Sequence, residues 1–355
     1  MFHKVRLEPV HSFQLKHYDL ALRTAYAQAK ELALAQREVP LLTPGALQTE
    51  KRGHSNFVYR YRYDATGKRI AEYLGPEGAQ ETAAKVAAVR EELRSSLALA
   101  DYSRDLRKIG FYGADNSTMV TVARLFNAGI FGGGALLAGS HAFGALMNDL
   151  GASVRFPMTE DLDIARRGPI EIAALPEGGF LEMLRETGLP FIEVPQLKRG
   201  APPTSFKVRG RSLKVDLLVP ARGEPYRPVK IAELGAHATG LPFLEFLLAS
   251  AGPSVLLGRD RIVPVTVPDA GRYAVHKLAV YAMRQAADSA KREKDAFQAA
   301  ALAAVLAPEQ DFVLQAAIDA MSRTLRAKAR LGARRALQWL GESHARASEL
   351  LASLA

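Results

Sequence analysis

The chain has 355 residues, a formal net charge of +10, 48% hydrophobic residues and no cysteine. This length allows one large domain or two to three smaller ones, and the missing cysteines exclude a disulfide framework and a thiolate metal site. The start, MFHKVRLEPVHSF, lacks the apolar core of a secretion signal, and no segment reaches the ~18 apolar residues of a membrane span. We therefore expect a soluble cytoplasmic protein without a membrane partner, whose basic balance favours partners that carry phosphate.

The N-terminal part predicts a helix, a β-hairpin and a second helix. Residues 13–37 are rich in alanine, leucine, lysine and glutamine, which favours a helix. In FVYRYRY (57–63) aromatic side chains alternate with arginine and valine, and DATG marks a turn, as in a hairpin. Its aromatic face and its arginines suit nucleic acid. The alternative is that the tyrosines pack on a neighbouring helix such as the one predicted for 79–107.

The middle of the chain mixes helices and strands. Residues 116–131 predict an amphipathic helix with Asn116 or Ser117 as its N-cap. A triple glycine follows, then the short apolar strand ALLAG (135–139) and a helix that Gly151 closes. FPMTEDLDIA (156–165) and SFKVRG-RSLKVDLLVP (205–220) predict a strand and a hairpin ending in a strand, which indicates an α+β or α/β unit.

Three aspartates lie in strand-like segments of this region. Asp161 and Asp163 are two residues apart, so in a strand both carboxylates point to the same face. Asp216 is a single acid in an apolar strand, where it is costly unless paired or bound to metal. Oxygen ligands of this kind suit Mg²⁺ or Mn²⁺, and two such ions can promote a phosphoryl displacement. The alternative for Asp216 is a structural ion pair with Lys214 or Arg211.

Gly139-Ser140 separates the predicted strand from the next helix. Glycine permits a tight turn and the close approach of a phosphate. The helix that we expect to begin near His141 presents free N–H groups and its positive dipole end, and Ser140 adds a hydroxyl. We interpret this turn as a binding site for a triphosphate. The alternative is an ordinary strand-to-helix turn.

This set of residues resembles the signature of the DNA polymerase β-like nucleotidyltransferase superfamily. That signature is a Gly-Ser turn, a D-x-D strand and a third acid on a later strand, here Gly139-Ser140, Asp161-Leu162-Asp163 and Asp216. The interval 141–160 is longer than in many members. The resemblance implies an α+β fold, with an α/β nucleotidyltransferase core around a mixed sheet.

A second resemblance lies downstream. HKLAVYAMR and KREKDAFQAAAL are similar to helical motifs of bacterial nucleotidyltransferase-like proteins, including AbiEii/MenT-type toxins. The resemblance implies that Lys277 contacts the nucleotide triphosphate, that Asp295 stands in a second helical motif, and that Arg284 belongs to the nucleotide site. From the residues alone, Asp295 would equally pair with Lys291 one helical turn away.

Together these features predict three regions. Residues 1–110 form N-terminal helices and the hairpin, as a nucleic-acid-binding or packing arm; 111–268 form the catalytic core; and 269–355 form a C-terminal helical bundle that completes the nucleotide site.

The expected reaction moves a nucleoside monophosphate from an NTP to an acceptor hydroxyl and releases pyrophosphate. Residues 323–346 and the hairpin are strongly basic, which favours RNA such as tRNA as the acceptor. Three alternatives stay open: transfer to a small molecule, nucleotidylation of a protein by a toxin that has a cognate antitoxin, and a non-catalytic relative that only binds nucleic acid. The alanine-rich helices also suit self-association. The sequence does not specify the base of the NTP.

Overall fold

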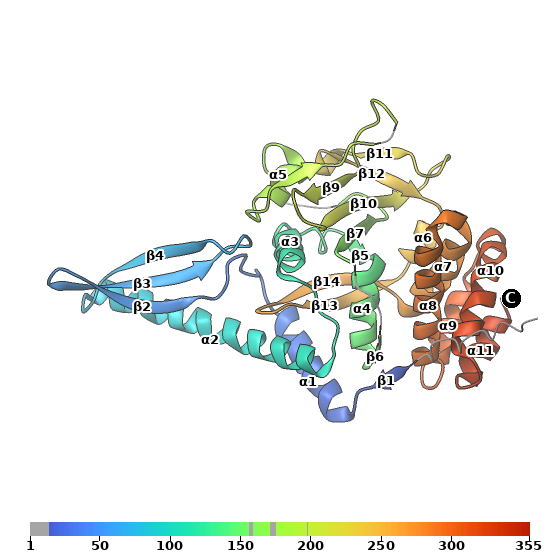
Figure 1. The fold of residues 1–355 in the computed structure, drawn as a ribbon, viewed down its shortest axis with the longest axis horizontal. Helices are drawn as coiled ribbons and strands as arrows, with labels where there is room; N and C mark the ends of the chain where they lie inside the picture. Colours follow the sequence, from blue (N-terminus) through green and yellow to red (C-terminus); the bar gives the residue numbers. More distant parts are fainter. Residues whose placement is uncertain (1–13, 156–158, 171–174, 197) are drawn as a thin grey trace, which may run out of the picture. The chain divides into compact units, whose positions relative to one another are not determined.

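The computed structural model describes residues 14–155, 159–170, 175–196 and 198–355 (Figure 1). The first 13 residues, which carry the prediction about a secretion signal, and residues 156–158 of one predicted strand lie outside this part. The chain is α+β, as predicted. It divides into two compact units, which we describe separately. The sheet unit contains 19–151 and the described part of 158–268; the helical unit contains 269–355 with strands β1 and β6.

A mixed seven-stranded sheet organises the sheet unit. Its strands are β5 (Ala135–Ala138), β7 (Asp161–Arg166), β8 (Phe191–Glu193), β9 (Ser205–Val208), β10 (Lys214–Pro220), β11 (Pro228–Ile231) and β12 (Ala236–Leu241). The main path runs β11-β12-β10-β7-β5, and β9 pairs with both β10 and β8. β7 and β10 are parallel neighbours, whereas β5 is antiparallel to β7. Strands that are distant in sequence therefore meet at the centre of this sheet.

The sheet has one buried face and one partly exposed face. On β10 and β12 buried residues alternate strictly with half-buried ones. Leu162, Ile164, Val215 and Leu217 are at most 2% exposed and form part of the core. Because side chains alternate along a strand, the residues between them share the opposite face. That face carries the aspartates.

Helices and a hairpin surround this sheet. They are α3 (Asn116–Asn127), α4 (Gly139–Asp149), α5 (Gly179–Arg185), η1 (Ala232–Leu234), α6 (Leu244–Leu247), β13 (Ala251–Leu257) and β14 (Ile262–Pro268). The prediction that Asn116 or Ser117 caps α3 is wrong. The cap is Asp115, whose carboxylate accepts hydrogen bonds from the N–H groups of Ser117 and Thr118. A carboxylate accepts two free N–H groups there and also favours the positive end of the helix dipole.

The N-terminal part of the sheet unit is a three-stranded sheet between two helices. Its elements are α1 (Leu20–Leu34), β2 (Ala46–Arg52), β3 (Ser55–Tyr63), β4 (Arg69–Pro76) and α2 (Gln80–Ile109). The predicted hairpin is β3 and β4, and β2 adds a strand that the sequence analysis did not predict. Helix α1 begins seven residues later than expected, because Asp19 caps it.

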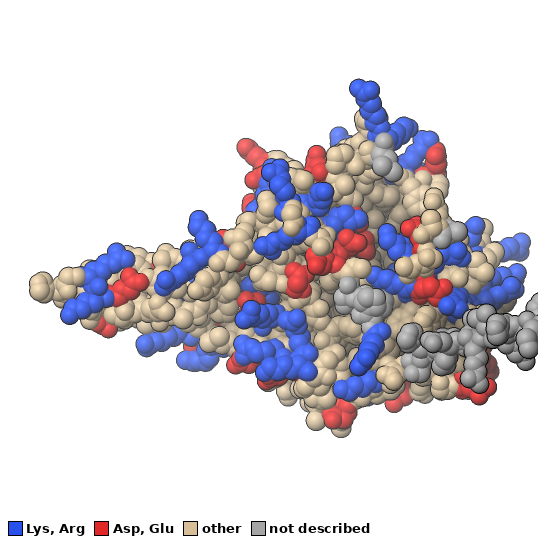
Figure 2. Space-filling view, viewed as in Figure 1, with Lys and Arg blue, Asp and Glu red and all other residues tan. Residues whose placement is uncertain are grey.

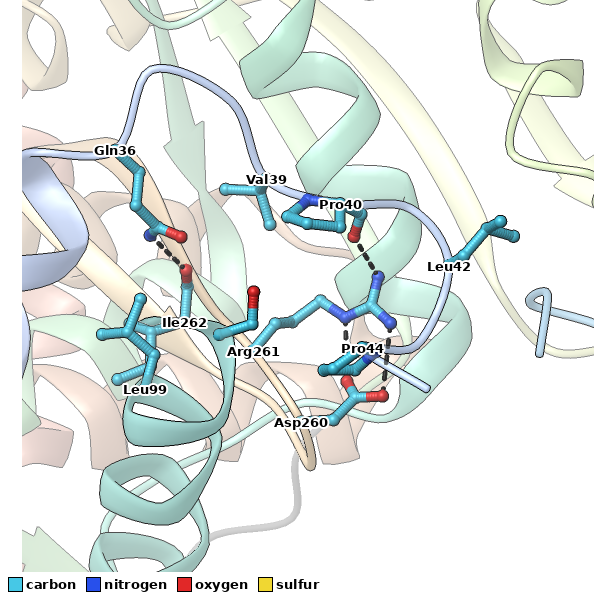
Figure 3. Close-up of a pocket in the computed structure, with 10 residues that line it drawn as sticks. Gln36, Val39, Pro40, Leu42, Pro44, Leu99, Asp260, Arg261 and Ile262 are labelled. Atoms are coloured by element: carbon cyan, nitrogen blue, oxygen red, sulfur yellow. Dashed lines mark hydrogen bonds and ion pairs between the residues drawn. The ribbon is translucent and has the colours of Figure 1, made fainter. Parts of the chain in front are cut away.

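Arg261 fixes the segment between α1 and β2 to the end of the β13–β14 hairpin (Figure 3). Its guanidinium donates to the carbonyl oxygens of Pro40 and Leu41 and pairs with Asp260. Gln36 donates to the carbonyl of Ile262 beside it. The adjoining cavity of about 20 Å³ accommodates about one water. This arrangement is structural, since the charge of Arg261 is already paired.

The helical unit is built around α7. Its elements are β1 (Leu15–His17), β6 (Ala152–Val154), α7 (Ala270–Met283), η2 (Ala286–Asp288), α8 (Ser289–Leu306), α9 (Asp311–Asp319), α10 (Arg323–Leu340) and α11 (Ala345–Ala352). α7 packs against α8, α9 and α10, while β1 and β6 form an antiparallel pair. Small side chains permit close packing: Gly332 of α10 lies against the carbonyl of Leu278. None of the helices in the described part is long and apolar enough to cross a bilayer.

Candidate active site

Three carboxylates share the half-buried face of the central sheet. Asp161 and Asp163 are two residues apart on β7, and Asp216 lies on β10 opposite Asp163. Residues two apart on a strand, and partners across a ladder, project to the same side. The intervening Leu162 and Val215 are fully buried on the other side. The parallel pairing of β7 with β10 thus brings together acids that are more than 50 positions apart in the sequence.

Lys214 stands on the same face, opposite Asp161. Its Nζ lies 2.7 Å from Oδ2 of Asp216. Burial by itself would lower the pKa of Lys214, but the hydrogen bond to Asp216 and the charges of Asp216, Asp161 and Asp163 raise it above its ordinary value. Lys214 therefore remains protonated and offsets part of the negative charge. The ion pair that the sequence offered as an alternative for Asp216 is present through Lys214.

The turn from β5 into α4 lies directly beside these acids. Ala138 pairs with Asp163, and Gly139 follows with a φ of +63°. A Cβ at Gly139 would collide with Oδ2 of Asp163. Glycine is required here both for its left-handed backbone and for this close approach. The N-terminus of α4 and the Asp163 carboxylate are consequently in contact.

Ser140 lies in the first turn of α4, which begins at Gly139 rather than near His141 as expected. The Ser140 side chain is buried, and its hydroxyl accepts a hydrogen bond of 3.2 Å from Oγ1 of Thr159. Sequence reasoning missed Thr159. The only signal was its position two residues before Asp161, at the entrance to β7.

The donors present are compatible with a divalent cation, although no such ion is placed by the structure. Among the described residues there is no group of three or more His, Asp or Glu side chains close enough to hold a metal, and Lys214 occupies one oxygen of Asp216. Two features favour a cation. The donor set is entirely oxygen, and Oδ1 of Asp216 is buried without a hydrogen-bond partner. A buried acceptor of this kind is unfavourable until a cation or donor reaches it.

The other predicted nucleotide-binding residues form a buried cluster in the helical unit. Nζ of Lys277 on α7 lies 2.7 Å from Oδ1 of Asp295 on α8, and Nε of Arg284 binds the second oxygen. Asp295 is fully buried. It pairs across helices rather than with Lys291 on its own helix. The structure thus brings these three residues together, and their role in nucleotide binding stays a prediction.

Charges within this cluster reinforce one another. Burial would raise the pKa of Asp295, but Lys277 and Arg284 hold it below its ordinary value. Burial would likewise lower the pKa of Lys277, and the Asp295 carboxylate raises it well above its usual range. For the neighbouring His276 burial is the largest effect: together with the Lys277 charge it lowers the pKa to about 3, although the Asp295 charge acts to raise it. The cluster of Lys277, Arg284 and Asp295 therefore keeps a net charge of +1, beside a neutral histidine.

Comparison with known families gives the class of this site. A family model described as nucleotidyltransferase matches residues 116–322, more than half of the chain. The chain belongs to this nucleotidyltransferase family. The matched region runs from α3 to the end of α9, so it includes every candidate residue from Gly139 to Asp295. Comparisons with curated proteins and with solved structures gave no match.

Membership of this family makes the protein a transferase for nucleotidyl groups. The β5–α4 turn and the carboxylates on β7 and β10 are the part of the matched region whose geometry suits that chemistry. The relation to the DNA polymerase β-like superfamily and to AbiEii/MenT-type toxins rests on the motifs alone.

Proposed function

We propose that this nucleotidyltransferase transfers a nucleoside monophosphate from an NTP to a hydroxyl group of RNA, with tRNA as the favoured acceptor, and releases pyrophosphate. The observation that carries the proposal is that Asp161, Asp163 and Asp216 share one face of two parallel strands and that Asp163 lies against Gly139 at the start of α4. A nucleotide site needs an anion-binding position next to acidic groups. The start of α4 is proposed as the anion-binding position and the aspartates are the acidic groups.

The proposed roles follow from position. Gly139 and Ser140 are proposed to bind the phosphates, because they form the first turn of α4, where the positive end of the helix dipole lies. The three aspartates would hold Mg²⁺ or Mn²⁺, which when bound offsets the charge of the phosphates. Asp216 is also proposed to accept the proton of the acceptor hydroxyl, and the absence of a hydrogen-bond partner at its Oδ1 supports this role.

Lys277 and Arg284 are proposed to contribute positive charge to nucleotide binding. Two cations share one carboxylate in their cluster, which leaves one positive charge for an anionic ligand. Charge of this kind stabilises negative charge that develops on a leaving pyrophosphate. Asp295 is then a positioning residue, since it holds both cations in place.

The basic character of the molecule supports RNA as the acceptor. Helix α10 contains six lysines and arginines and no acidic residue. Arg323, Lys328, Arg330 and Arg334 are exposed and have no ion-pair partner among the described residues. Cations that are not neutralised by the protein are available to phosphates of a nucleic acid.

The test is transfer from each α-³²P-labelled NTP to total RNA with Mg²⁺ or Mn²⁺. We expect label in RNA of tRNA size for one or more of the four nucleotides, and loss of that label in Asp163→Asn and Asp161→Asn. The matched control is Asp105→Asn, which removes an exposed carboxylate on α2. Full activity in a folded Asp163→Asn protein would show that this carboxylate is not required for transfer. Label on the protein and not on RNA would show that the acceptor is a protein.

A further inference from the structure

The three-stranded sheet β2-β3-β4 packs on α2 with its arginine face. Arg60 is 3% exposed, and its guanidinium binds both oxygens of Glu92 on α2 at 2.8 Å. Gly75 of β4, which pairs with Val58 on the same face, lies against Thr82 of α2. The tyrosines, which alternate with Arg60 along β3, therefore point away from α2 and do not pack on it.

The opposite face carries an aromatic row. Phe57, Tyr59, Tyr61 and Tyr63 alternate along β3, and Tyr73 of β4 lies opposite Tyr59. The rings of Tyr59 and Tyr61 are stacked with centroids 5.9 Å apart, and the Tyr59 and Tyr73 centroids are 5.4 Å apart. Tyr73 is 54% exposed and Tyr63 is 47% exposed. Tyr59 and Tyr61 are only 8% and 9% exposed, so they support the two exposed rings from below. The exposed rings of Tyr63 and Tyr73 are the part of this row that can contact a ligand.

Two arginines complete this aromatic face. The guanidinium of Arg69 lies 3.6 Å from the ring centroid of Tyr61, and that of Arg52 lies 5.1 Å from Tyr59. Both arginines are exposed. Stacking on a ring holds each guanidinium plane in place. Arg52 also donates to Glu50 and Arg69 to Gln48, and the remaining N–H groups of each guanidinium are left for a ligand. The face therefore presents flat apolar surfaces next to fixed hydrogen-bond donors.

The charge around this face is positive. Residues 46–76 contain six lysines and arginines but only three acids. On the helix-facing side Arg60 pairs with Glu92, and Arg62 pairs with Glu72. Asp64 lies in the turn after β3, where its carboxylate accepts hydrogen bonds from the N–H groups of Thr66 and Lys68. Lys51, Arg52, Lys68 and Arg69 thus outnumber the one remaining acid, Glu50. Figure 2 shows lysine and arginine side chains along this part of the molecule, at the left of the view.

We infer that the aromatic face of this sheet, through its exposed rings Tyr63 and Tyr73, binds single-stranded RNA. Unpaired bases stack on exposed aromatic rings irrespective of sequence, and arginines beside the rings bind the phosphates. A double helix keeps its bases stacked internally and offers no ring faces, so single strands suit this face better. Binding itself is independent of transfer; the identification of the bound strand as the acceptor rests on the proposed function.

The experiment measures binding of the full chain to a fluorescent, unstructured RNA oligonucleotide by anisotropy, without NTP or metal. We expect Tyr73→Ala to weaken binding about tenfold, the loss typical of one base-stacking ring, while Tyr73→Phe binds like the wild type. Arg52→Ala/Arg69→Ala should reduce the slope of log affinity against log salt by about 1.4, as expected for two phosphate contacts on a single strand. Arg90→Ala/Arg94→Ala, which removes two exposed charges from α2, is the matched control.

The outcomes separate this inference from the proposed function. Asp163→Asn should bind the oligonucleotide like the wild type while losing transfer. Equal binding by Tyr73→Ala and wild type, or a Tyr73→Phe protein as weak as Tyr73→Ala, overturns the inference even if transfer occurs. Tighter binding of a duplex than of the single strand also overturns it. A wild type that shows Tyr73-dependent RNA binding but no transfer leaves the inference standing and contradicts the proposed function.

Discussion

Gly139 lies where two parts of the proposed site meet, the N-terminus of α4 and the D-x-D segment of β7. Its φ of +63° costs an L-residue about 1–2 kcal/mol, and any Cβ would meet the carboxylate of Asp163. We expect Gly139→Ala to lose transfer activity nearly completely, because the D-x-D strand and the helix N-terminus must separate.

Gly134 provides the matched control for that prediction. It also has a positive φ, of +103°, but nothing lies within 4 Å of an added Cβ. Gly134→Ala should show a comparable loss of stability in urea and retain transfer. Equal activity of the two variants would show that the contact between Gly139 and Asp163 is unimportant.

His276 makes folding sensitive to acid. Its pKa is about 3 in the folded protein and near 6.5 in an unfolded chain. Between these values the unfolded chain binds a proton that the folded protein does not, so the free energy of unfolding decreases as the pH falls below about 6.5, by up to ~1.4 kcal/mol per pH unit.

Urea unfolding at pH 6.5, 5.5 and 4.5 measures this dependence. His276→Gln should show a flatter pH dependence than the wild type, because glutamine binds no proton in this range. His54→Gln, in the exposed turn between β2 and β3, should keep the wild-type slope. An unchanged slope in His276→Gln would contradict burial of a neutral histidine.

At the scale of elements, hydrophobic periodicity was sufficient to predict β7 and β10. Both strands alternate buried and half-buried residues, so the face of each aspartate followed from the sequence. The pairing of β7 with β10 did not, because register is set by tertiary contacts. β2 was missed for a related reason: Gln48 to Arg52 are all polar, and an edge strand with this composition has no apolar alternation to detect.

The helical unit illustrates the same limit. Its alanine-rich segments predicted helices but not which faces meet. Lys277 and Asp295 are 18 residues apart, and only the packing of α7 against α8 makes them partners. Their grouping came from a family resemblance, not from spacing.

The contact between α7 and α10 provides a prediction in which two effects oppose. Gly332→Ala would improve helix propensity by about 1 kcal/mol. The new Cβ would also collide with the backbone carbonyl of Leu278, which moves only with its helix, and overpacking of this kind costs about 1–3 kcal/mol. We expect a net loss of stability, seen as a lower urea midpoint. Ala327→Gly, at an exposed position of α10, reports the propensity effect alone. A higher midpoint in Gly332→Ala would show that α10 is not packed closely on α7.

At the scale of the whole molecule, the positively charged residues fall into two groups that differ in their exposure to solvent. Exposed cations on α10 and on the three-stranded sheet lie at the surface, where salt screens them. In the Lys277–Arg284–Asp295 cluster, Lys277 and Asp295 are buried and Arg284 is half-buried, so the effect of the cluster on a nucleotide should depend weakly on salt. RNA binding should therefore decrease steeply with ionic strength, whereas NTP binding should decrease little.

Nucleotide-induced stabilisation tests whether the helical unit takes part in NTP binding. A ligand at 100 times its Kd stabilises the folded state by about 2.7 kcal/mol, so NTP with Mg²⁺ should raise the melting temperature of the wild type. Lys277→Met should abolish most of this increase, because Asp295 then neutralises Arg284 and the cluster has no net positive charge. Lys291→Met, an exposed lysine on α8, should retain it. Since loss of Lys277 also disturbs a buried ion pair, the comparison is the increase caused by nucleotide in each variant, not the melting temperature itself. A full increase in Lys277→Met would restrict nucleotide binding to the sheet unit and leave the cluster a structural role.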